Sequence, residues 1–495
     1  MTFQPPRLGP GAIYLRSLDN LFRSNADLIR VAEIEPQTLW TKGTAPGSQP
    51  RGSPVEMRRL GALAQPCLVH GIGSPIGGTI CDQQQHIDEF RRWTQALGPP
   101  WFSEHLSILH VQGARGVQSC GFLMPPLQTE EQVELAARNI LSRKAAVGRP
   151  FAFETGVNYF VRQDYEMPDG DFFAAVAQAA DCGILLDLTN LWVNHKNGRT
   201  RIQDVLTRLP LERIWEVHLA GTEFAHGYWL DAHSGGIDAE LVEIAADFLP
   251  SLPNLGAIIF ELAADRVSSF GATAFLHQME TLSSLWPATP VPMRHNFVAP
   301  PASVKAPSLA AQVWERVIAH QMLPAADRPS NGVGELKIRE VDEQSFALYR
   351  HLTAAFRAGT IAEMLENTTR LLLIGMGEPA LRELMHRYIS LTPPASYPTD
   401  EALSFRRFLD ANAVPVPGLS DMLKFEAALV EAAADSRTLQ VTFTKDIELM
   451  LSDIREGRMP GPSSDRQETV LEIGVEPAPF IRMAATTATA VCPQE

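Results

Sequence analysis

The feature that most constrains the fold is an alternation of short apolar runs with helix-like segments over the first 290 residues. The segments between the runs, such as DQQQHIDEFRRWTQAL and TEEQVELAARNILSRKAAVG, have helical periodicity. The eight apolar runs cover residues 11–16, 29–36, 66–73, 100–108, 150–156, 183–190, 213–221 and 256–263. Alternating strands and helices predict an α/β fold with a parallel sheet, and eight repeats favour a closed (β/α)8 TIM barrel over an open, doubly wound sheet.

Polar residues end most of these runs. They are Glu35, His70, Glu104 with His105, Glu154, Asp187 with Asn190, His218 and Glu261. In a (β/α)8 barrel the carboxyl ends of the strands converge on one active-site pocket. So many carboxylates in one place would repel each other, and bound metal resolves that conflict. A single residue of this kind more often caps a helix or bonds a loop, but a full ring predicts a metal centre. Nitrogen and oxygen donors without a cysteine cluster suit Fe, Mn or Zn.

The stretch EVHLAGTEFAHGYWLDAHSGG at 216–236 adds two further candidates. We expect His218 to end the seventh strand, and Asp231 and His233 to return from the following loop to the same pocket. His226 is treated as a loop residue. Four other histidines follow no strand end, so we expect surface or structural roles for them: His86, His110, His195 and His277.

Composition and charge exclude several classes of protein. A chain of 495 residues is too long for one ordinary core, which predicts two domains. The formal net charge of −15 argues against binding to nucleic acid or to an anionic membrane surface. The five scattered cysteines, the absence of a signal-like start and the lack of a long apolar run predict a soluble, cytoplasmic protein.

A second region follows the predicted barrel. The Pro-, Ala- and Ser-rich stretch VAPPASVKAPS is typical of a linker. We therefore expect a barrel domain at 1–295, a linker at 296–307, a helical domain at 308–465, and a short strand with a flexible tail at 466–495. Residues 306–465 hold 16 basic and 22 acidic residues, a net charge of −6, which disfavours DNA binding. TLQVTFT (438–444) and TVLEIGV (469–475) are expected to pair as a small sheet.

Motifs at the predicted strand ends resemble a known family. VHGIGSPIGG, SEHLS, FETGVNYF, LLDLTNLWVNHKN, EVHLAGT, LDAH and FEL, spread in order over residues 8–285, resemble the multinuclear non-haem iron-dependent oxidases that include the methanobactin oxidase. The resemblance implies a xylose-isomerase-like barrel with two or three irons of mixed Fe(II)/Fe(III) valence and O₂ as co-substrate. It further implies oxidative modification of a ribosomally synthesised precursor peptide, at Cys or a nearby residue.

The resemblance also implies which side chains act. The implied metal ligands are His70, His105, Glu154, Asp187, Asn190, His218, Asp231, His233 and Glu261. Glu104, His218 and Asn190 are expected to act in catalysis, with Glu104 alternatively orienting a ligand by a hydrogen bond. This chain departs from the family pattern at Thr155, Thr189 and Thr222, where the family usually has Asn, Asn and His. These departures put the third iron or the substrate contacts in doubt, and His226 could compensate for Thr222.

The helical region has a resemblance of its own. YRHLTAAFRAG, LRELMHRYISLTPPASYP, FRRFLDAN and LSDMLKFEAAL resemble the partner proteins that accompany these oxidases and bind the leader of the precursor. This implies an oxidase fused in cis to its partner; the alternative is a helical bundle that only stabilises the barrel.

Two other functional hypotheses are compatible with the sequence. One is a Mn- or Zn-dependent isomerase or hydrolase on the same barrel, although no strand end offers the lysine that a sugar isomerase normally has near its metal. The other is a non-catalytic peptide-binding scaffold.

Overall fold

The structure, a computed structural model, describes residues 3–45, 47–81, 84–288, 311–329, 342–461, 469–474 and 480–483. Two compact units divide the chain. The first, here the barrel unit, comprises Met1–Trp40 and Gly52–Arg350. The second, the helical unit, comprises Thr41–Arg51 and His351–Glu495. The predicted linker at 296–307 lies outside the described residues, and the function assigned to the 308–465 region stays a prediction.

The barrel unit is built on eight parallel strands that close on themselves in the order β1-β14-β11-β10-β9-β6-β5-β2. The strands are β1 (Gly9–Ile13), β2 (Val31–Ile34), β5 (Cys67–Gly71), β6 (Phe102–His105), β9 (Phe151–Glu154), β10 (Gly183–Asp187), β11 (Ile214–Ala220) and β14 (Ala257–Glu261). Seven of them lie within the predicted apolar runs and β1 overlaps the first run, starting two residues earlier, so the predicted TIM barrel is confirmed.

Side chains fill the barrel interior in layers, because alternate residues of each strand point inward. An apolar layer contains Val31, Leu68, Ala152, Leu185 and Ile259 among its buried members. Two residues further along each of these strands the inward position is polar: Glu33, His70, Glu154, Asp187 and Glu261. The same alternation that builds the core therefore presents polar groups at the carboxyl ends.

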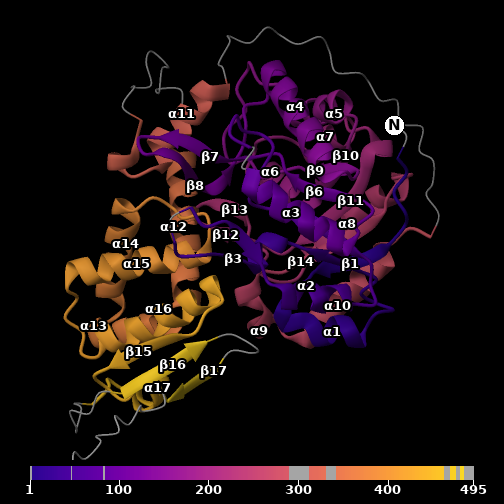
Figure 1. The fold of residues 1–495 in the computed structure, drawn as a ribbon. Coiled ribbons are helices and arrows are strands. Elements are labelled where there is room, and N and C mark those ends of the chain that lie inside the picture. The colour runs from indigo at the N-terminus through magenta and orange to yellow at the C-terminus, as the bar shows by residue number, and fades with distance from the viewer. Residues whose placement is uncertain are drawn as a thin grey trace, which may run out of the picture. The chain divides into compact units, whose positions relative to one another are not determined.

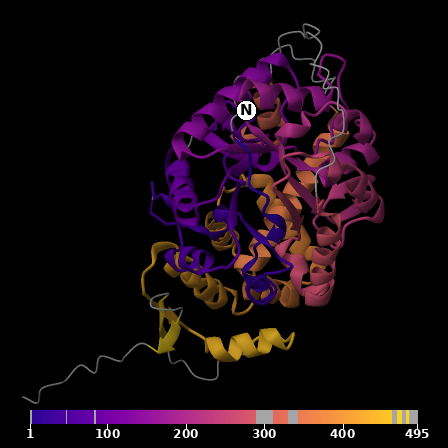
Figure 2. The same cartoon turned by 90° about the vertical axis from the view of Figure 1, so that its right-hand side faces the viewer.

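Helices surround the strands (Figure 1 and Figure 2). They are α1 (Asp19–Ser24), α2 (Pro54–Gly61), α3 (Gln84–Leu97), α4 (Glu130–Val147), α5 (Asp169–Ala179), α6 (Leu188–Lys196), α7 (Ile202–Leu206), α8 (Ala239–Phe248), α9 (Val267–Phe270) and α10 (Ala272–Leu285). Helix α4 shows how local sequence sets the bounds. Thr129 caps its start by accepting a hydrogen bond from the Gln132 amide, and Gly148 ends it in a left-handed conformation with φ of 75°.

Three hairpins and two further helices remain to be described. Of these, the β3–β4 hairpin and helix α12 cross the bounds of the barrel unit. The hairpins are β3–β4 (Trp40–Lys42, Pro50–Gly52), β7–β8 (Ile108–Gly113, Gly116–Met124) and β12–β13 (Thr222–Ala225, Tyr228–Asp231). Helix α11 (Ala311–Met322) packs on β7 and β8, and α12 (Glu343–Met364) begins in the barrel unit. The helical region thus contributes α11 to the barrel unit, which differs from the expected start of a separate domain at 308.

The helical unit has its own apolar core, which includes Leu371, Phe405, Met422 and Phe443. Its remaining elements are α13 (Glu366–Met376), α14 (Glu378–Leu391), α15 (Pro398–Asn412), α16 (Leu419–Asp435), α17 (Ile447–Arg455) and the strands β15 (Leu439–Phe443), β16 (Thr469–Gly474) and β17 (Phe480–Met483). The predicted pairing of 438–444 with 469–475 is confirmed as antiparallel β15–β16. A third strand, β17, which was not predicted, pairs with β16, and the residues after Met483 lie outside the described residues.

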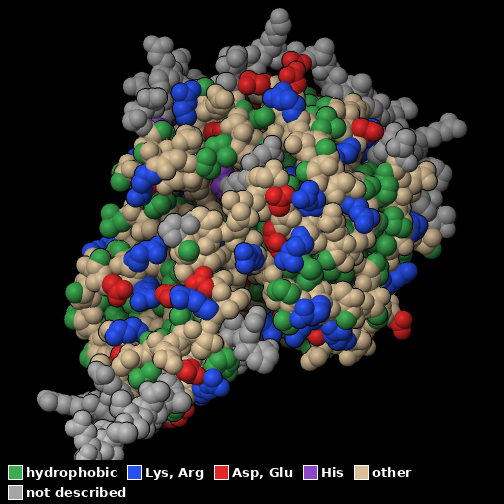
Figure 3. Space-filling view, in the orientation of Figure 1, with side chains coloured by type: hydrophobic (Ala, Val, Ile, Leu, Met, Phe, Trp, Pro, Cys, Tyr) green, Lys and Arg blue, Asp and Glu red, His purple; other side chains and the backbone are tan. Residues whose placement is uncertain are grey.

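The surface charges, the helix lengths and the cysteines can be compared with what the composition predicts. Acidic and basic side chains are interspersed on the face drawn in Figure 3. Within the described ranges, no helix combines the length and apolar character needed to cross a bilayer. The four cysteines placed there are buried, and none of them is in a disulfide: Cys67, Cys81, Cys120 and Cys182.

Candidate metal centre

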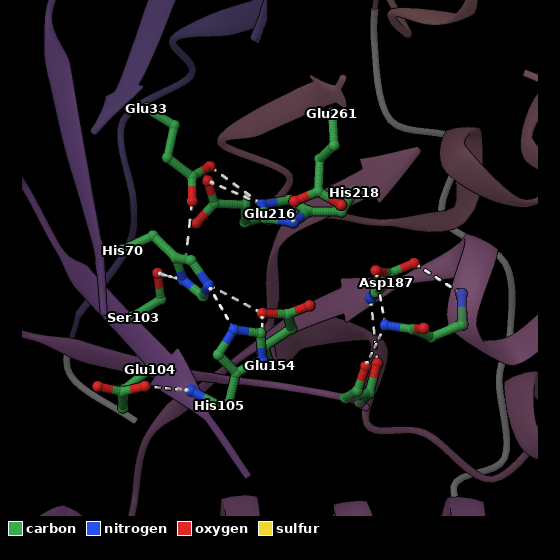
Figure 4. A network of polar contacts seen from close by, with 12 residues as sticks. Glu33, His70, Ser103, Glu104, His105, Glu154, Asp187, Glu216, His218 and Glu261 are labelled. Atoms are coloured by element: carbon green, nitrogen blue, oxygen red, sulfur yellow. Dashed lines mark hydrogen bonds and ion pairs between the residues drawn. The ribbon is translucent and has the colours of Figure 1, made fainter. Parts of the chain in front are cut away.

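The carboxyl ends of seven barrel strands bring imidazoles and carboxylates together (Figure 4). They are Glu33 on β2, His70 on β5, His105 on β6, Glu154 on β9, Asp187 on β10, His218 on β11 and Glu261 on β14. Three overlapping groups among the described residues bring donor atoms within 4.8 Å of one another: His70–His105–Glu154, Glu154–Asp187–His218 and Glu33–Glu216–His218. Glu154 is shared by the first two groups and His218 by the last two.

The first group has donor spacings that fit a metal ion. His70 Nε2 lies 3.0 Å from Glu154 Oε2 and 3.1 Å from His105 Nε2, and His105 Nδ1 lies 2.9 Å from the same Glu154 oxygen. Metal bonds of about 2.0–2.2 Å place neighbouring donors about 3 Å apart. Glu154 Oε2 is fully buried and has no contact of hydrogen-bond geometry. A cation bound by this group would satisfy that oxygen.

The second group continues inward from Glu154. His218 is fully buried, and its Nδ1 lies 3.1 Å from Glu261 Oε1 without hydrogen-bond geometry. Asp187 accepts hydrogen bonds from the backbone and side-chain nitrogens of Asn190, both at 2.8 Å, and the first of these caps helix α6. The side-chain oxygen of Asn190 is left buried and unpartnered, as a ligand atom would be before metal binds.

The β12–β13 hairpin supplies the outer donors. Asp231 ends β13, and His233 follows in a left-handed conformation with φ of 47°. His233 Nε2 lies 3.2 Å from Asp231 Oδ2 and 3.5 Å from Glu261 Oε2. The predicted return of this segment to the strand ends is what the geometry shows. A non-glycine residue in this region of φ is uncommon and carries strain, which is frequent at functional sites.

Burial and neighbouring charge shift the ionisation of this cluster in opposite directions. Burial alone would lower the pKa of His70, but Glu154 and Glu33 raise it to about 10. Burial alone would raise the pKa of Glu154, yet His105 and His70 hold it well below its usual value. Burial, reinforced by nearby carboxylates, raises the pKa of Asp187 well above its usual value. Protons on imidazole and carboxyl groups thus offset a local excess of negative charge, which a bound cation would also offset.

Glu104 lies apart from this cluster. Adjacent strand residues point to opposite faces, so His105 faces the barrel interior and Glu104 faces outward. Its carboxylate accepts hydrogen bonds from the Ser74 amide at 3.2 Å and the His105 amide at 3.1 Å. Glu35, at the end of β2, precedes a 3-10 helix and is in none of the three groups. The structure therefore does not bring Glu104 among the expected catalytic groups; it holds the backbone of His105.

With this geometry established, comparison with known proteins identifies the family. The profile described as "RiPP precursor modification enzyme MbnB/TglH/ChrH" matches residues 24–267, where RiPP denotes a ribosomally synthesised and post-translationally modified peptide. A UPF0276 protein of Anaeromyxobacter sp. (strain Fw109-5) is 30% identical over 231 residues, 46% of this chain and 79% of that protein. A UPF0276 protein of Chromobacterium violaceum is 31% identical over 209 residues, 42% of this chain and 74% of that protein. The chain belongs to the MbnB/TglH/ChrH family.

Solved structures that resemble the chain are barrels of low sequence identity. The 3-keto-D-glucoside 4-epimerase YcjR from E. coli has 12% identity and a TM-score of 0.36, covering 56% of this chain and 99% of its own. An L-ribulose 3-epimerase has 13% identity and a TM-score of 0.37, covering 57% of this chain and 95% of its own. These low identities and TM-scores say nothing about the reaction of this member of the MbnB/TglH/ChrH family.

Two departures from the expected family pattern have structural roles here. Thr155 Oγ1 accepts a hydrogen bond from the Asp187 amide at 3.0 Å, and Thr189 Oγ1 accepts one from the Ala220 amide at 2.8 Å. Both residues are buried; Thr155 joins the segment after β9 to the end of β10, and Thr189 joins the start of α6 to the end of β11. They fix the backbone that carries the candidate ligands.

The third departure lies on the β12–β13 hairpin. Thr222 Oγ1 donates to Asp238 Oδ2 at 2.6 Å. His226, which could have compensated for it, sits exposed between the two strands of the hairpin, and neither residue is in a donor group. Thr222 lies opposite Asp231 in the hairpin. Asp231, and not Thr222, contacts His233.

Three residues close to the cluster were missed by the sequence analysis. Glu33 Oε2 lies 3.0 Å from His218 Nε2, and Ser103 Oγ lies 2.8 Å from His70 Nδ1. Glu216 is fully buried and accepts a hydrogen bond from the Trp101 indole at 2.8 Å. Burial raises the pKa of Glu216 well above its usual value, and Glu33 raises it further. An acidic residue in phase with the inward apolar positions of its strand is the signal that could have found both glutamates.

Proposed function

We propose that this member of the MbnB/TglH/ChrH family is an iron- and O₂-dependent oxidoreductase that modifies a ribosomally synthesised precursor peptide. The observation that carries the proposal is the pair of donor groups sharing Glu154 at the carboxyl ends of the barrel. A shared carboxylate is the arrangement that lets two metal ions lie side by side. The family describes RiPP precursor modification enzymes, and oxidation by iron is the more specific reaction that we infer.

The donor chemistry supports iron. We propose that the ions are held by His70, His105, Glu154, Asp187, Asn190, His218, Asp231, His233 and Glu261. Imidazole and carboxylate are the donors used by non-haem iron, and the cysteines placed by the structure are in none of the donor groups. A mixture of neutral imidazoles and anionic carboxylates suits both ferrous and ferric states. We propose two or three ions, because Asp231, His233 and Glu261 form a third set of neighbours.

The exposure of two histidines supports one side of the centre as the approach for a peptide. The side chain of His233 is 31% exposed and that of His105 is 15% exposed, whereas His218 is fully buried. We therefore propose that the substrate residue meets the centre between His105 and His233. Bound iron would supply activation of O₂ and the electron transfer that oxidises the peptide. Thr155 and Thr189 hold the backbone so that the ligands keep their places during the reaction.

We propose that the helical unit binds the leader of the precursor, as a partner domain fused in cis. Its own core supports a role as a separately folded module, and its motifs resemble leader-binding partner proteins. The described cysteines are buried and form no disulfide, which supports a reducing, cytoplasmic setting.

The proposal is tested with the full chain and short precursor peptides encoded beside its gene. The wild-type protein, loaded anaerobically with ferrous iron, should change the mass of a precursor only after O₂ is admitted. His105→Ala should abolish the change, whereas His277→Ala, at an exposed histidine on α10, should not. Modification by a metal-free preparation, or equal modification without O₂, would refute the proposal.

A further inference from the structure

One buried glutamate contacts a histidine from each of the two donor groups that share Glu154. Glu33 lies on β2, is fully buried, and belongs to neither of the groups that share Glu154. Its Oε2 lies 3.0 Å from His218 Nε2 and its Oε1 lies 3.7 Å from His70 Nδ1 (Figure 4). Only the contact to His218 has hydrogen-bond geometry.

We propose that Glu33 is a positioning residue that fixes which nitrogen of His218 binds metal. A neutral imidazole carries one N–H donor and one acceptor nitrogen. When Nε2–H donates to Glu33, Nδ1 is left as the acceptor, and Nδ1 is the atom that faces Glu261 at 3.1 Å. A carboxylate at this position also makes the ring a stronger ligand. The inference rests on the proposed metal centre and adds the residue that controls its deepest histidine.

The neighbouring Glu216 does not share this role. Its Oε1 lies 4.0 Å from the same His218 nitrogen, beyond hydrogen-bond distance. Its other oxygen accepts the hydrogen bond of Trp101 at 2.8 Å, which ties it to the bottom of the barrel. Glu33 and Glu216 are therefore a matched pair of fully buried glutamates, of which one holds His218 and the other does not.

His70 has a separate support. Its Nδ1 lies 2.8 Å from Ser103 Oγ, closer than the 3.7 Å to Glu33. Removal of Glu33 should consequently weaken metal binding on the His218 side and leave the His70–His105–Glu154 group able to bind. Such a site-selective loss is not expected if Glu33 only fills space.

The experiment compares anaerobic uptake of ferrous iron by metal-stripped wild-type protein, Glu33→Leu, Glu33→Gln and Glu216→Gln. Binding isotherms give the affinity and number of ions, and unfolding in the presence of a chelator gives the stability of each metal-free protein. Glu33→Leu should bind its weakest iron about 10- to 100-fold less tightly than wild type. Glu33→Gln keeps an acceptor oxygen without charge, so its iron affinity should lie between those of wild type and Glu33→Leu. Glu216→Gln should lose less affinity than Glu33→Gln, because Glu216 Oε1 lies 4.0 Å from His218 Nε2.

Stability separates a positioning role from a structural one. Glu33→Leu and Glu33→Gln both remove the charge beside the buried His218, which lowers the stability of the metal-free protein. Iron binding should nevertheless weaken under conditions in which each metal-free variant is still folded. Wild-type affinity in Glu33→Leu, an equal loss in Glu216→Gln, or a loss that follows the unfolding midpoint would overturn the inference. If Glu33→Leu fails to fold, Glu33→Gln against Glu216→Gln decides in the same way. No iron uptake by wild-type protein would instead refute the proposed function.

Discussion

His70 and His105 face each other through their Nε2 atoms at 3.1 Å, although they come from different strands, and both contact the same oxygen of Glu154. His105 uses Nε2 toward His70 and Nδ1 toward Glu154, so one cation here would be held by His70 Nε2, the Glu154 oxygen and one of the two His105 nitrogens. Glu154 also reaches the group containing Asp187 and His218.

Loss of Glu154 should therefore affect more than one metal position. We predict that Glu154→Ala loses both irons of the adjacent groups, whereas His105→Ala loses about one equivalent. Iron and protein concentrations of anaerobically loaded samples measure the difference, and His277→Ala serves as the surface control. Equal stoichiometry in Glu154→Ala and His105→Ala would show that Glu154 is not shared.

Ser103 should affect the affinity of the iron proposed to bind at the His70–His105–Glu154 group. Its hydroxyl contacts His70 Nδ1 at 2.8 Å and orients the ring so that Nε2 faces His105 and Glu154. We predict that Ser103→Ala weakens one iron about tenfold, the low end of the effect of residues that orient ligands. Competitive titration with a chelator measures this change, and an unaltered isotherm would contradict it.

Metal removal should destabilise the barrel unit. The cluster holds several buried carboxylates whose repulsion a bound cation relieves. A ligand present at 100 times its Kd adds about 2.7 kcal/mol to the free energy of unfolding. We predict that thermal unfolding of the iron-loaded protein shifts to lower temperature on chelation, and that Glu154→Ala shows little of this shift. Superimposable melting curves with and without chelator in the wild type would argue against the centre.

Acid should destabilise the barrel unit through a histidine remote from the metal centre. Burial, with Arg143 and His110 nearby, lowers the pKa of His86 from 6.5 to about 3. Below pH 6.5 the unfolded chain takes up a proton on His86 that the folded chain refuses until about pH 3, so stability falls as pH falls through this window. The loss approaches about 1.4 kcal/mol per pH unit. Denaturant titrations of metal-free protein at pH 7 and pH 5 should show a smaller loss in His86→Gln than in wild type, and parallel losses would disprove the assignment.

The helical unit should depend on one buried ion pair. Arg357 Nε donates to Glu401 Oε1 at 2.8 Å, both side chains are less than 5% exposed, and Tyr388 donates to the same oxygen at 2.9 Å. Removing one partner leaves an uncompensated buried charge. We predict that Arg357→Met destabilises this unit by about 3–5 kcal/mol. Hydrogen exchange should show early opening of α15 and α16 while the barrel strands stay protected; uniform exchange would contradict this.

The barrel strands and most candidate ligands could be predicted from the sequence because each strand is a short apolar run with a polar residue at its end. Glu33 could not be found in this way, since it lies inside β2, whereas the polar residue that ends the apolar run, Glu35, follows the strand. The dipeptide Glu104-His105 was ambiguous from position alone, but strand alternation allows only one of the two to face inward. The association of α11 with β7 and β8 depends on packing between segments about 200 residues apart, which local patterns do not contain.

Asp231 and His233 differ from the other candidate ligands in being carried by the β12–β13 hairpin and the turn after it. A hairpin can change in length or sequence without moving the register of the eight strands, since loops tolerate change that strands do not. Within a lineage, the outer side of the centre can therefore diverge while His70, Glu154 and His218 stay in place. New peptide preferences can evolve here by exchange of a single hairpin.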